Sequence, residues 1–331
     1  MIAADQPVRW GVLGAGAIAA TVSADLAALP GHVLQAVGAR DGDRAAAFAR
    51  QHGVARSYGS YAELVADPDV DVVYVATTHA QHHEHALLCL RAGKPVLVEK
   101  AFTLNAAQAA EVAAEARARG LFAMEAMWVR FHPLVRRVSQ LLADGAIGSV
   151  IGVRADLSKR FTFDPSHRLF DLAAGGGALL DLGVYPAAVT WTWLGRPATV
   201  QATGSLSPTG SDLSAALQWG YPDGRVAQIY TSAAGDSPFA ALVTGTDGWI
   251  ALEPRIHRGR RVVVHSSAGD EQIDAPTIEG NGYRAELEEV ARCLRAGETE
   301  SPVVPLSDTI GILETLDEAR RQLGVRYLAD G

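Results

Sequence analysis

Residues 8–19 read VRWGVLGAGAIA, and this stretch decides the fold of the first part of the chain. Its first half, Val8–Leu13, is a nearly continuous apolar run, which predicts a strand that is buried on both faces. A helical pattern follows from about Ala17 to Leu29 and is stopped by a Pro-Gly pair. The stretch therefore predicts a buried strand, a glycine turn and a helix in succession.

The turn between strand and helix carries the pattern GxGxxA. Glycine at 14 permits a tight turn, glycine at 16 lets a pyrophosphate approach the backbone, and Ala19 lets helix and strand pack closely. The start of the helix offers free N–H groups and the positive end of its dipole to phosphate oxygens. We therefore expect a nicotinamide dinucleotide to bind here, through Gly14, Gly16, Ala17 and Ile18.

The first 126 residues alternate short β-rich runs with Ala-rich helical stretches. Such alternation with short links predicts a doubly wound parallel sheet, that is, a Rossmann dinucleotide-binding domain at 1–126. Strands are expected at Val8–Leu13, Val33–Ala39, Val54–Ser57, Val70–Ala76, Pro95–Val98 and Leu121–Ala126. Helices are expected at Ala17–Leu29, Arg44–Gln51, Tyr61–Ala66, His82–Arg91 and Ala106–Arg119.

The pattern changes from residue 127 onward. Longer strands alternate polar with apolar residues, which predicts a mostly antiparallel sheet with one face covered. The tail from Tyr283 to Leu323 returns to helix. The expected fold class is α/β, with a second, α+β domain at 127–331 whose last helices pack back toward the first domain. Its strands are expected at Ser149–Leu157, Ala198–Ser205, Ser214–Tyr221, Val226–Ser232 and Ala240–Thr244.

Composition excludes several classes of partner. A net charge of −8 gives no electrostatic footprint for nucleic acid or for an anionic membrane surface. No apolar run reaches the ~18 residues of a membrane span, and the start, MIAADQPVR, lacks the apolar segment of a signal peptide. Cys89 and Cys293 lie far apart, which favours reduced thiols. We expect a cytoplasmic protein whose partner is a small-molecule substrate, with no nucleic acid and no membrane.

The end of the second strand bears on the choice of dinucleotide. Arg40 follows Ala39 there, and an arginine at this place suits the 2′-phosphate of NADP and can stack on adenine. Asp41, one position later, would hold the ribose 2′-hydroxyl of NAD if its side chain turned inward. NADP is therefore the expected cofactor and NAD remains possible, with Ala39 and Arg40 as contacts.

Three segments together resemble the glucose–fructose oxidoreductase and inositol dehydrogenase (Gfo/Idh/MocA) family. They are the glycine turn, Val98-Glu99-Lys100 after the fifth strand, and residues 175–185, GGGALLDLGVY. The resemblance covers nearly the whole chain. Within the family, residues 124–131, MEAMWVRF, and Tyr185 are most similar to the dihydrodiol dehydrogenases and the NADP-dependent D-xylose dehydrogenases. Most sugar-oxidising members have histidine where this chain has Tyr185.

The resemblance implies features that the residues alone do not. The C-terminal sheet should be large and open, with the nicotinamide end of the cofactor against it. Its free face should form the interface of a homodimer or a dimer of dimers. Further cofactor contacts are implied at Thr77, His79, His82, Glu99 and Arg168.

Lys100 is the strongest candidate for proton chemistry. It ends a strand at the carboxyl edge of the parallel sheet, where open α/β sheets bind their ligands. It is one of three lysines among 29 basic residues, and an ammonium group, unlike a guanidinium, can lose its proton when desolvated. Oxidation of a secondary alcohol needs such a group to take the hydroxyl proton. The alternative is a solvated lysine at a strand end.

Asp181 and Tyr185 are four residues apart and would share one face of a helix. Tyr185 would relay the substrate proton while the charge of Lys100 stabilises its phenolate, and Asp181 would orient Lys100. Two features oppose this arrangement. Pro186 disfavours the helical region for Tyr185, and Ala101 stands where relatives have proline, so this chain must either accept a cis bond before alanine or aim its lysine differently. The alternative roles are a packing carboxylate and a core aromatic.

Four histidines, His79, His82, His83 and His85, lie close together after the fourth strand. Three of them would face one way if the helix began early, but a zinc ion would need a fourth ligand and no cysteine is near. We therefore expect no metal, with His79 and His82 beside the cofactor and His83 and His85 solvated.

Trp128, Arg130 and Phe131 follow the last strand of the first domain and are expected to line the substrate side. An aromatic wall would suit a flat ring or a sugar face, although core packing is an equal alternative for Trp128 and Phe131. The expected activity is reversible dehydrogenation of a secondary alcohol in a cyclic diol or pyranose sugar. The alternatives are a non-catalytic NAD(P)-binding sensor or scaffold and a redox-assisted glycosidase.

Overall fold

The computed structural model describes residues 2, 3, 5–255, 258–267 and 269–330. The chain forms two compact units. The first contains the described residues up to Thr103 together with Ala107–Ala126 and Glu279–Thr309. The second contains Leu104–Ala106, Met127–Ile278 and the described residues from Ile310 onward. The division thus differs from a single cut after residue 126, because a late segment of the chain folds with the first unit.

The first unit is a Rossmann fold. Within its described residues, six parallel strands pair in the order β3-β2-β1-β4-β5-β6, which is the order of dinucleotide-binding sheets and confirms the predicted doubly wound fold. The strands are β1 (Val8–Leu13), β2 (His32–Gly38), β3 (Arg56–Tyr58), β4 (Val72–Val75), β5 (Val96–Glu99) and β6 (Ala123–Ala126). The helices are α1 (Ala17–Ala27), α2 (Gly42–His52), α3 (Tyr61–Ala66), α4 (His79–Arg91), α5 (Ala106–Arg119) and α8 (Arg284–Ala296).

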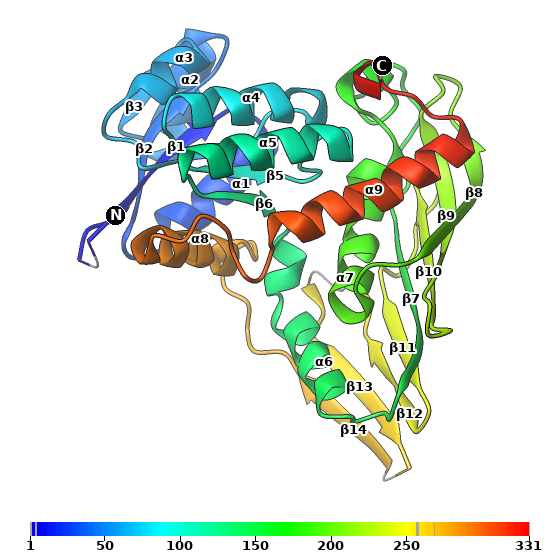
Figure 1. Ribbon diagram of the computed structural model, residues 1–331. Helices are drawn as coiled ribbons and strands as arrows, with labels where there is room; N and C mark the ends of the chain where they lie inside the picture. The colour runs from blue at the N-terminus through cyan, green and yellow to red at the C-terminus, as the bar shows by residue number, and fades with distance from the viewer. Residues whose placement is uncertain (1, 4, 256–257, 268, 331) are drawn as a thin grey trace. The chain divides into compact units, whose positions relative to one another are not determined.

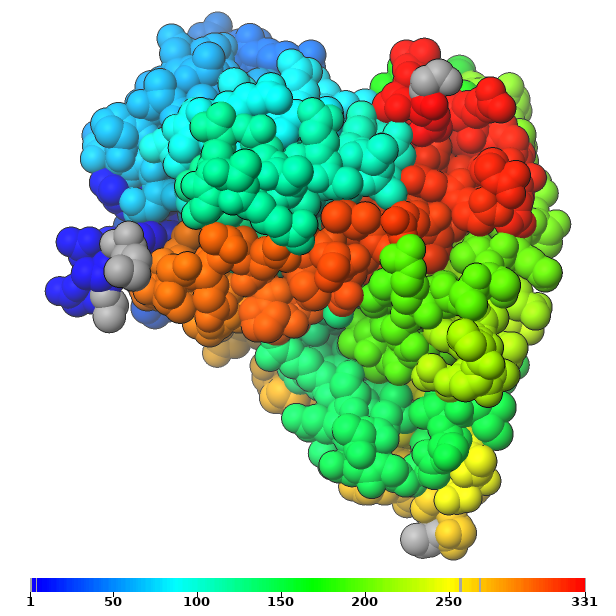
Figure 2. All heavy atoms as spheres, in the orientation of Figure 1, coloured from blue at the N-terminus to red at the C-terminus, as the bar shows by residue number. Residues whose placement is uncertain are grey.

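Helices cover both faces of this sheet, α4 and α5 on one and α1 and α8 on the other (Figure 1). The side chains of α4 and α5 form the outer surface on the side shown in Figure 2. Val8, Trp10, Val12 and Leu13 of β1 are completely buried, and each such side chain contributes roughly 1.5–3 kcal/mol of stability. The apolar run of β1 is therefore buried on both faces, as its composition predicts.

The late segment is tied to the first unit by a buried carboxylate. Asp25 of α1 is 1% exposed and accepts hydrogen bonds from the backbone N–H groups of Asn281 (2.8 Å) and Tyr283 (3.0 Å). These two amides precede α8, so Asp25 fixes the entry of that helix. Sequence periodicity predicts the helix but not this anchor.

The second unit is built on a large, mostly antiparallel sheet, as expected. Its described strands, eight in number, pair in the order β14-β13-β12-β11-β7-β10-β9-β8, and every pair is antiparallel except β7 with β10. The strands are β7 (Val150–Ser158), β8 (Thr199–Leu206), β9 (Asp212–Gly220), β10 (Val226–Ser232), β11 (Ala241–Gly245), β12 (Gly248–Leu252), β13 (Arg261–Ser266) and β14 (Gly269–Asp274). The helices are α6 (Pro133–Ala143), α7 (Val184–Leu194) and α9 (Leu306–Leu323).

The two faces of this sheet differ. Helix α7 packs on β7 and β10, where Ala155 and Ile229 are buried. The opposite face carries exposed side chains, including Arg154, Gln228 and Tyr230, around a shallow hollow of about 810 Å³. The alternation of exposed and buried residues follows the period of two read from the sequence.

The glycine-rich segment 175–177 starts the helical stretch that leads into α7. Gly177 has φ +145°, and a Cβ there would lie 2.1 Å from Oδ1 of Asp212. Asp212 is buried and its Oδ2 accepts the backbone N–H of Leu179 at 2.6 Å; burial raises the pKa of Asp212 to about 6. Only glycine lets the chain pass this close to the carboxyl group that caps the helix.

One described helical stretch, Leu172–Leu194, is long and apolar enough by composition alone to cross a membrane. In its most apolar window, 78% of the residues are buried inside the protein. Core helices of globular proteins share these properties, so the stretch is weak evidence for a membrane segment.

Candidate active site

The glycine turn of the first unit has the geometry of a phosphate cradle. Gly14 has φ +107°, and a Cβ on it would lie 2.9 Å from the carbonyl oxygen of Ala76 at the end of β4. Gly16 is the N-cap of α1 and caps it with no side chain, and a Cβ on Gly16 would meet no protein atom within 4 Å. The first residues of α1, Ala17 and Ile18, therefore present their backbone to open space. A pyrophosphate fits this combination of open space and helix N-terminus.

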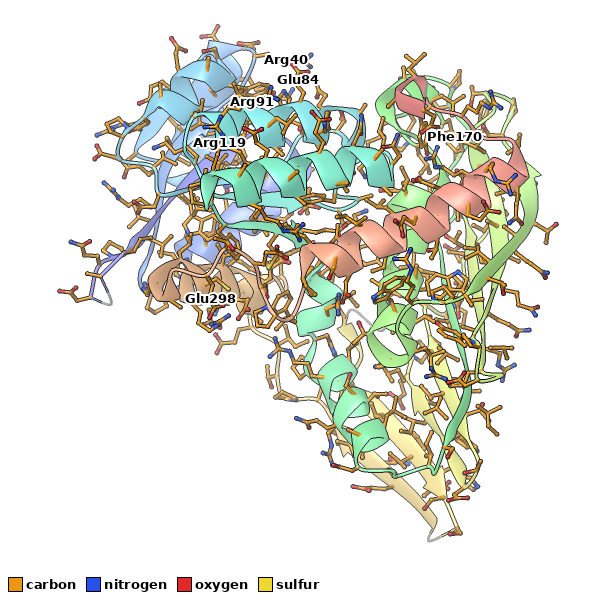
Figure 3. All side chains as sticks on the ribbon, in the orientation of Figure 1. Arg40, Glu84, Arg91, Arg119, Phe170 and Glu298 are labelled. Atoms are coloured by element: carbon orange, nitrogen blue, oxygen red, sulfur yellow. The ribbon has the colours of Figure 1, made fainter. Side chains whose placement is uncertain are left out.

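The loop after β2 separates the two candidates for cofactor selection. Asp41 is the N-cap of α2, and its Oδ1 accepts the backbone N–H groups of Asp43 (2.9 Å) and Arg44 (3.3 Å). Its carboxylate is thus engaged by the helix. Arg40 is exposed and projects from the loop (Figure 3), next to buried Ala39. The Arg40 side chain is therefore exposed to solvent, while the Asp41 carboxylate caps α2.

Helix α4 begins at His79, earlier than the sequence predicts, and buries three of its four histidines. His79 and His82 meet edge to face with ring centroids 5.7 Å apart. His85 is 5% exposed and its Nδ1 lies 3.0 Å from Oγ1 of Thr77. The expectation that His85 is solvated is wrong, because His85 lies three residues after buried His82 and shares its inward face of α4. Burial lowers the pKa of His85.

His83 lies on the outer side of α4, with Nε2 2.8 Å from a carboxylate oxygen of Glu111. In the described part of the chain, no group of three or more histidine, cysteine, aspartate or glutamate side chains has an arrangement suited to a metal ion. Of the histidines of α4, His82 faces two carbonyl oxygens, His83 a carboxylate and His85 a hydroxyl.

The segment after β5 carries Lys100. The Lys100–Ala101 peptide bond is cis. Glu99 precedes it, and its Oε1 accepts a 2.5 Å hydrogen bond from the hydroxyl of Tyr74 inside the first unit. Glu286 of α8 is also buried. Burial and the neighbouring carboxylates, among them Glu99, raise the pKa of Glu286 well above its usual range. Glu99 is 5% exposed, so the structure places it on the interior side of β5.

Helix formation around Asp181 and Tyr185 departs from a regular α-helix. Asp181 lies in a π-helical turn, Leu179–Gly183, and Tyr185 is the second residue of α7. Pro186 follows within the first turn of α7. Proline is tolerated there because the first turn of a helix does not need its N–H groups as donors, and because the preceding π-turn is wider than an α-helical turn. The sequence argument that Pro186 would displace Tyr185 from the helix is therefore wrong.

Asp181 forms an ion pair within the second unit. Nη2 of Arg168 lies 3.1 Å and 3.2 Å from its two carboxylate oxygens. Asp181 is buried, whereas the Arg168 side chain is 48% exposed. Sequence reasoning proposed both residues separately, Arg168 for the cofactor and Asp181 for Lys100, and missed that they pair.

The hydroxyl of Tyr185 lies among aromatic side chains. Nε1 of Trp128 donates a hydrogen bond to it at 3.2 Å, and the two rings meet edge to face. Phe239 packs on the other side with ring centroids 6.2 Å apart. The phenol oxygen thus accepts a hydrogen bond from the indole N–H. Trp128 thus directs the hydroxyl of Tyr185.

Phe239 is a residue that the sequence analysis missed. Its φ of +54° is unusual for a bulky side chain, and its backbone N–H is held by Oδ2 of Asp156 at 3.0 Å. No periodic pattern signals such a position, since it depends on a contact with a distant strand. Arg130 and Phe131 lie with Trp128 in a short 3-10 helix and are buried, and Arg136 covers the ring of Phe131.

Comparison with known proteins agrees with this architecture. Residues 8–127 match the model of an oxidoreductase family with an NAD-binding Rossmann fold, and residues 135–251 match the GFO/IDH/MocA C-terminal domain. The chain belongs to the GFO/IDH/MocA family. The predicted family, fold and enzyme class, an NAD(P)-dependent oxidoreductase, are thereby confirmed.

Curated relatives in this family align over almost their whole length. The trans-1,2-dihydrobenzene-1,2-diol dehydrogenases of Mus musculus and Homo sapiens are both 38% identical to the chain, cover 98% of it and are themselves covered to 99%. The 3-ketoreductase KijD10 from Actinomadura kijaniata, in complex with NADP and TDP-benzene, is 27% identical with a TM-score of 0.85, covering 96% of this chain and 98% of its own. Aldose-aldose oxidoreductase from Caulobacter crescentus, 23% identical with a TM-score of 0.88 and coverage of 96% and 98%, shares the fold.

Substitution of Gly14 should lower the stability of the protein, whereas substitution of Gly16 should weaken NADP binding. Gly14→Ala forces a methyl group toward the Ala76 carbonyl at a left-handed φ, and should lower the free energy of unfolding by about 1–3 kcal/mol. Gly16→Ala meets no protein atom and should change it by less than about 1 kcal/mol, while weakening NADP binding at least tenfold. Thermal unfolding and calorimetric titration would measure both. Wild-type NADP affinity in Gly16→Ala would contradict phosphate binding at this turn.

Proposed function

We propose that this protein is an NADP-preferring dehydrogenase that oxidises a secondary alcohol of a cyclic vicinal diol, with a dihydrodiol favoured over a pyranose sugar such as D-xylose. The observation that carries the proposal is the Tyr185 hydroxyl, which Trp128 holds by a donated hydrogen bond at 3.2 Å. The aromatic surroundings of Tyr185 suit a flat ring. The 38% identity to dihydrodiol dehydrogenases over 98% of the chain supports the same substrate class.

Proton handling is assigned to the chain's own side chains. When bound, the dinucleotide supplies the hydride acceptor in oxidation and the hydride donor in reduction. Tyr185 takes the proton of the substrate hydroxyl in oxidation and returns it in reduction. Lys100 stabilises the phenolate by its positive charge, and Asp181, paired with Arg168, balances that charge. The carbinol carbon loses a hydride and its oxygen loses a proton, so the product is a ketone.

Substitution at the proposed proton-handling residues should separate chemistry from binding. Lys100→Met should lower kcat/KM about 100-fold or more, because it removes the charge that stabilises the phenolate. Lys100→Arg keeps that charge and should lose less activity than Lys100→Met. Tyr185→Phe should lower kcat/KM as much as Lys100→Met, whereas Tyr230→Phe, on the open sheet face, should not. The assay is NADPH formation with trans-1,2-dihydrobenzene-1,2-diol and with D-xylose, alongside NADP affinity by calorimetry.

The outcomes of this assay also decide between the alternatives. Near-normal turnover in Lys100→Met would remove lysine from the mechanism. NADP binding by the wild type without turnover of any diol or sugar would favour a non-catalytic sensor. Glycoside cleavage without net NADPH formation would indicate redox-assisted glycosidase chemistry.

Cofactor preference is assigned to Arg40. Because Asp41 caps α2, Arg40 is the charged group left to meet the 2′-phosphate of NADP. Arg40→Ala should weaken NADP binding about 10- to 100-fold, the equivalent of one charge-assisted hydrogen bond of roughly 1.5–3 kcal/mol, and leave NAD binding unchanged.

Asp41→Asn is the matched control for Arg40→Ala, because asparagine also caps helices well. This variant should keep the ratio of NADP to NAD affinity. A ratio that changes with Asp41→Asn, or does not change with Arg40→Ala, would reassign the selection to the aspartate. Calorimetric titration with both dinucleotides gives the ratio directly.

We further propose that the open face of the second unit's sheet forms the interface of a homodimer or a dimer of dimers. Tyr230 is 46% exposed in the middle of this face, and the polar side chains Gln201, Gln218 and Gln228 surround it in the hollow. Tyrosine in such a setting is typical of an interface centre. The described helix α7 packs on the opposite face of the sheet, against β7 and β10.

Light scattering coupled to gel filtration would test the dimer. The double variant Gln228→Glu, Tyr230→Glu places like charges on both sides of the interface and should yield monomers. Leu328→Glu, at a side chain that is 90% exposed and off the sheet, is the matched control and should stay assembled. A monomeric wild type at tens of micromolar concentration would refute the interface.

A further inference from the structure

The segment that carries Lys100 is held in place by two side chains from elsewhere in the first unit. Lys100 follows β5 directly. The peptide group that joins Ala101 to Phe102 is held on both sides: its N–H, from Phe102, donates to Oε1 of Glu125 at 3.0 Å, and its carbonyl oxygen, from Ala101, lies 2.8 Å from Nδ1 of His82. Glu125 is itself held by the hydroxyl of Thr309 at 2.9 Å. The direction in which Lys100 leaves the strand therefore depends on polar contacts.

His82 bridges the ends of two neighbouring strands. Its Nδ1 faces Ala101 after β5, and its Nε2 lies 3.1 Å from the carbonyl of Thr77 after β4. The ring is 0% exposed, and His79 covers it edge to face. Because it has no exposed surface, His82 cannot serve as the direct cofactor contact that the resemblance implies. Its role has to be sought in the two loops that it joins.

The two contacts of the ring cannot both be hydrogen bonds in the neutral state. Both partners are carbonyl acceptors, and a neutral imidazole has a single N–H. Burial lowers the pKa of His82 to about 4, against the opposing effect of the two carbonyls. The positive charge of Lys100 and that of His85 act in the same direction as burial. At neutral pH the ring is therefore neutral and donates a hydrogen bond to only one of the two carbonyl oxygens.

We infer that His82 is a positioning residue for Lys100, which carries its proton on Nδ1 and donates it to the carbonyl of Ala101. The shorter distance, 2.8 Å against 3.1 Å, favours this tautomer. The inference rests on the proposed function, in which the charge of Lys100 stabilises the phenolate of Tyr185. In this arrangement the orientation of Lys100 depends on a buried histidine that contacts neither cofactor nor substrate.

Packing alone does not explain a histidine at this place. An apolar side chain of similar size would fill the same volume, but it would leave the carbonyl of Ala101 buried without a donor. The peptide group would then be held by Glu125 alone, and a rotation of its carbonyl toward another donor would move Lys100, one residue earlier. A displacement of about 1 Å at a catalytic group can lower a rate about 100-fold.

Two substitutions isolate the contact. His82→Asn places an amide N–H where histidine has Nδ1, so it keeps the donor to Ala101 and loses the approach to Thr77. His82→Gln places its amide near the position of Nε2, so it keeps the approach to Thr77 and loses the donor to Ala101. Both remove the ring, which makes them matched for the loss of packing, and thermal unfolding would verify that both fold.

The position of Lys100 can be read without turnover because the chain has three lysines, Lys94, Lys100 and Lys159. Reductive methylation with ¹³C-formaldehyde gives each a separate methyl resonance, and Lys100→Met assigns the one of interest. In His82→Gln the Lys100 resonance and its pH titration should shift, whereas in His82→Asn they should stay as in the wild type. Lys94 and Lys159 serve as internal controls that should not move.

Kinetics provide the second readout. In His82→Gln, kcat should fall about 10- to 100-fold with NADP affinity within threefold of wild type, and His82→Asn should keep most of its kcat. Equal effects of the two variants on the Lys100 resonance, or none in His82→Gln, would overturn the inference.

A ¹⁵N spectrum of the wild type that shows the proton of His82 on Nε2 would also overturn it, whether or not the variants fold. A wild type without any dehydrogenase activity would instead refute the proposed function. The resonance of Lys100 and the tautomer of His82 would still decide the positioning role.

Discussion

The close approach of the Gly14 turn to the carbonyl of Ala76 is the constraint on which the rest of the first unit depends. A separation that leaves no room for a Cβ brings the ends of β1 and β4 together and turns the start of α1 toward open space. The same edge of the sheet carries the loop after β2, with Arg40, and the loop after β5, with Lys100. Parallel strands bring these loops to one edge. The candidate binding and catalytic residues of the unit therefore lie at the edge where the N-terminus of α1 is also found.

Three buried carboxylates bind backbone N–H groups. Asp212 caps the helical stretch before α7, Asp25 binds the two amides before α8, and Glu125 binds the loop after Lys100. A carboxylate used in this way satisfies amides that would otherwise be buried without partners. Other buried carboxylates pair with arginine, as Asp181 does with Arg168 and Asp67 with Arg56.

The sequence predicts what local patterns encode. The apolar run of β1 and the glycine turn predict a buried strand and a phosphate cradle, and the alternation of β8 to β11 predicts a sheet with one exposed face. Contacts between distant segments leave no such pattern. The left-handed Phe239 beside Tyr185 and the pairing of Arg168 with Asp181 both arise from tertiary packing, so periodicity could not reveal them.

The anchoring of residues 279–309 to Asp25 has a consequence for how the protein is made. The strands of the Rossmann sheet, β1 to β6, come before residues 127–278 of the second unit, whereas α8, which packs beside α1 on one face of the sheet, comes after them. Chains emerge from the ribosome at about 5–20 residues per second and their domains fold as they appear. The area of the nascent sheet that α8 covers therefore stays exposed until residues 284–296 have been synthesised.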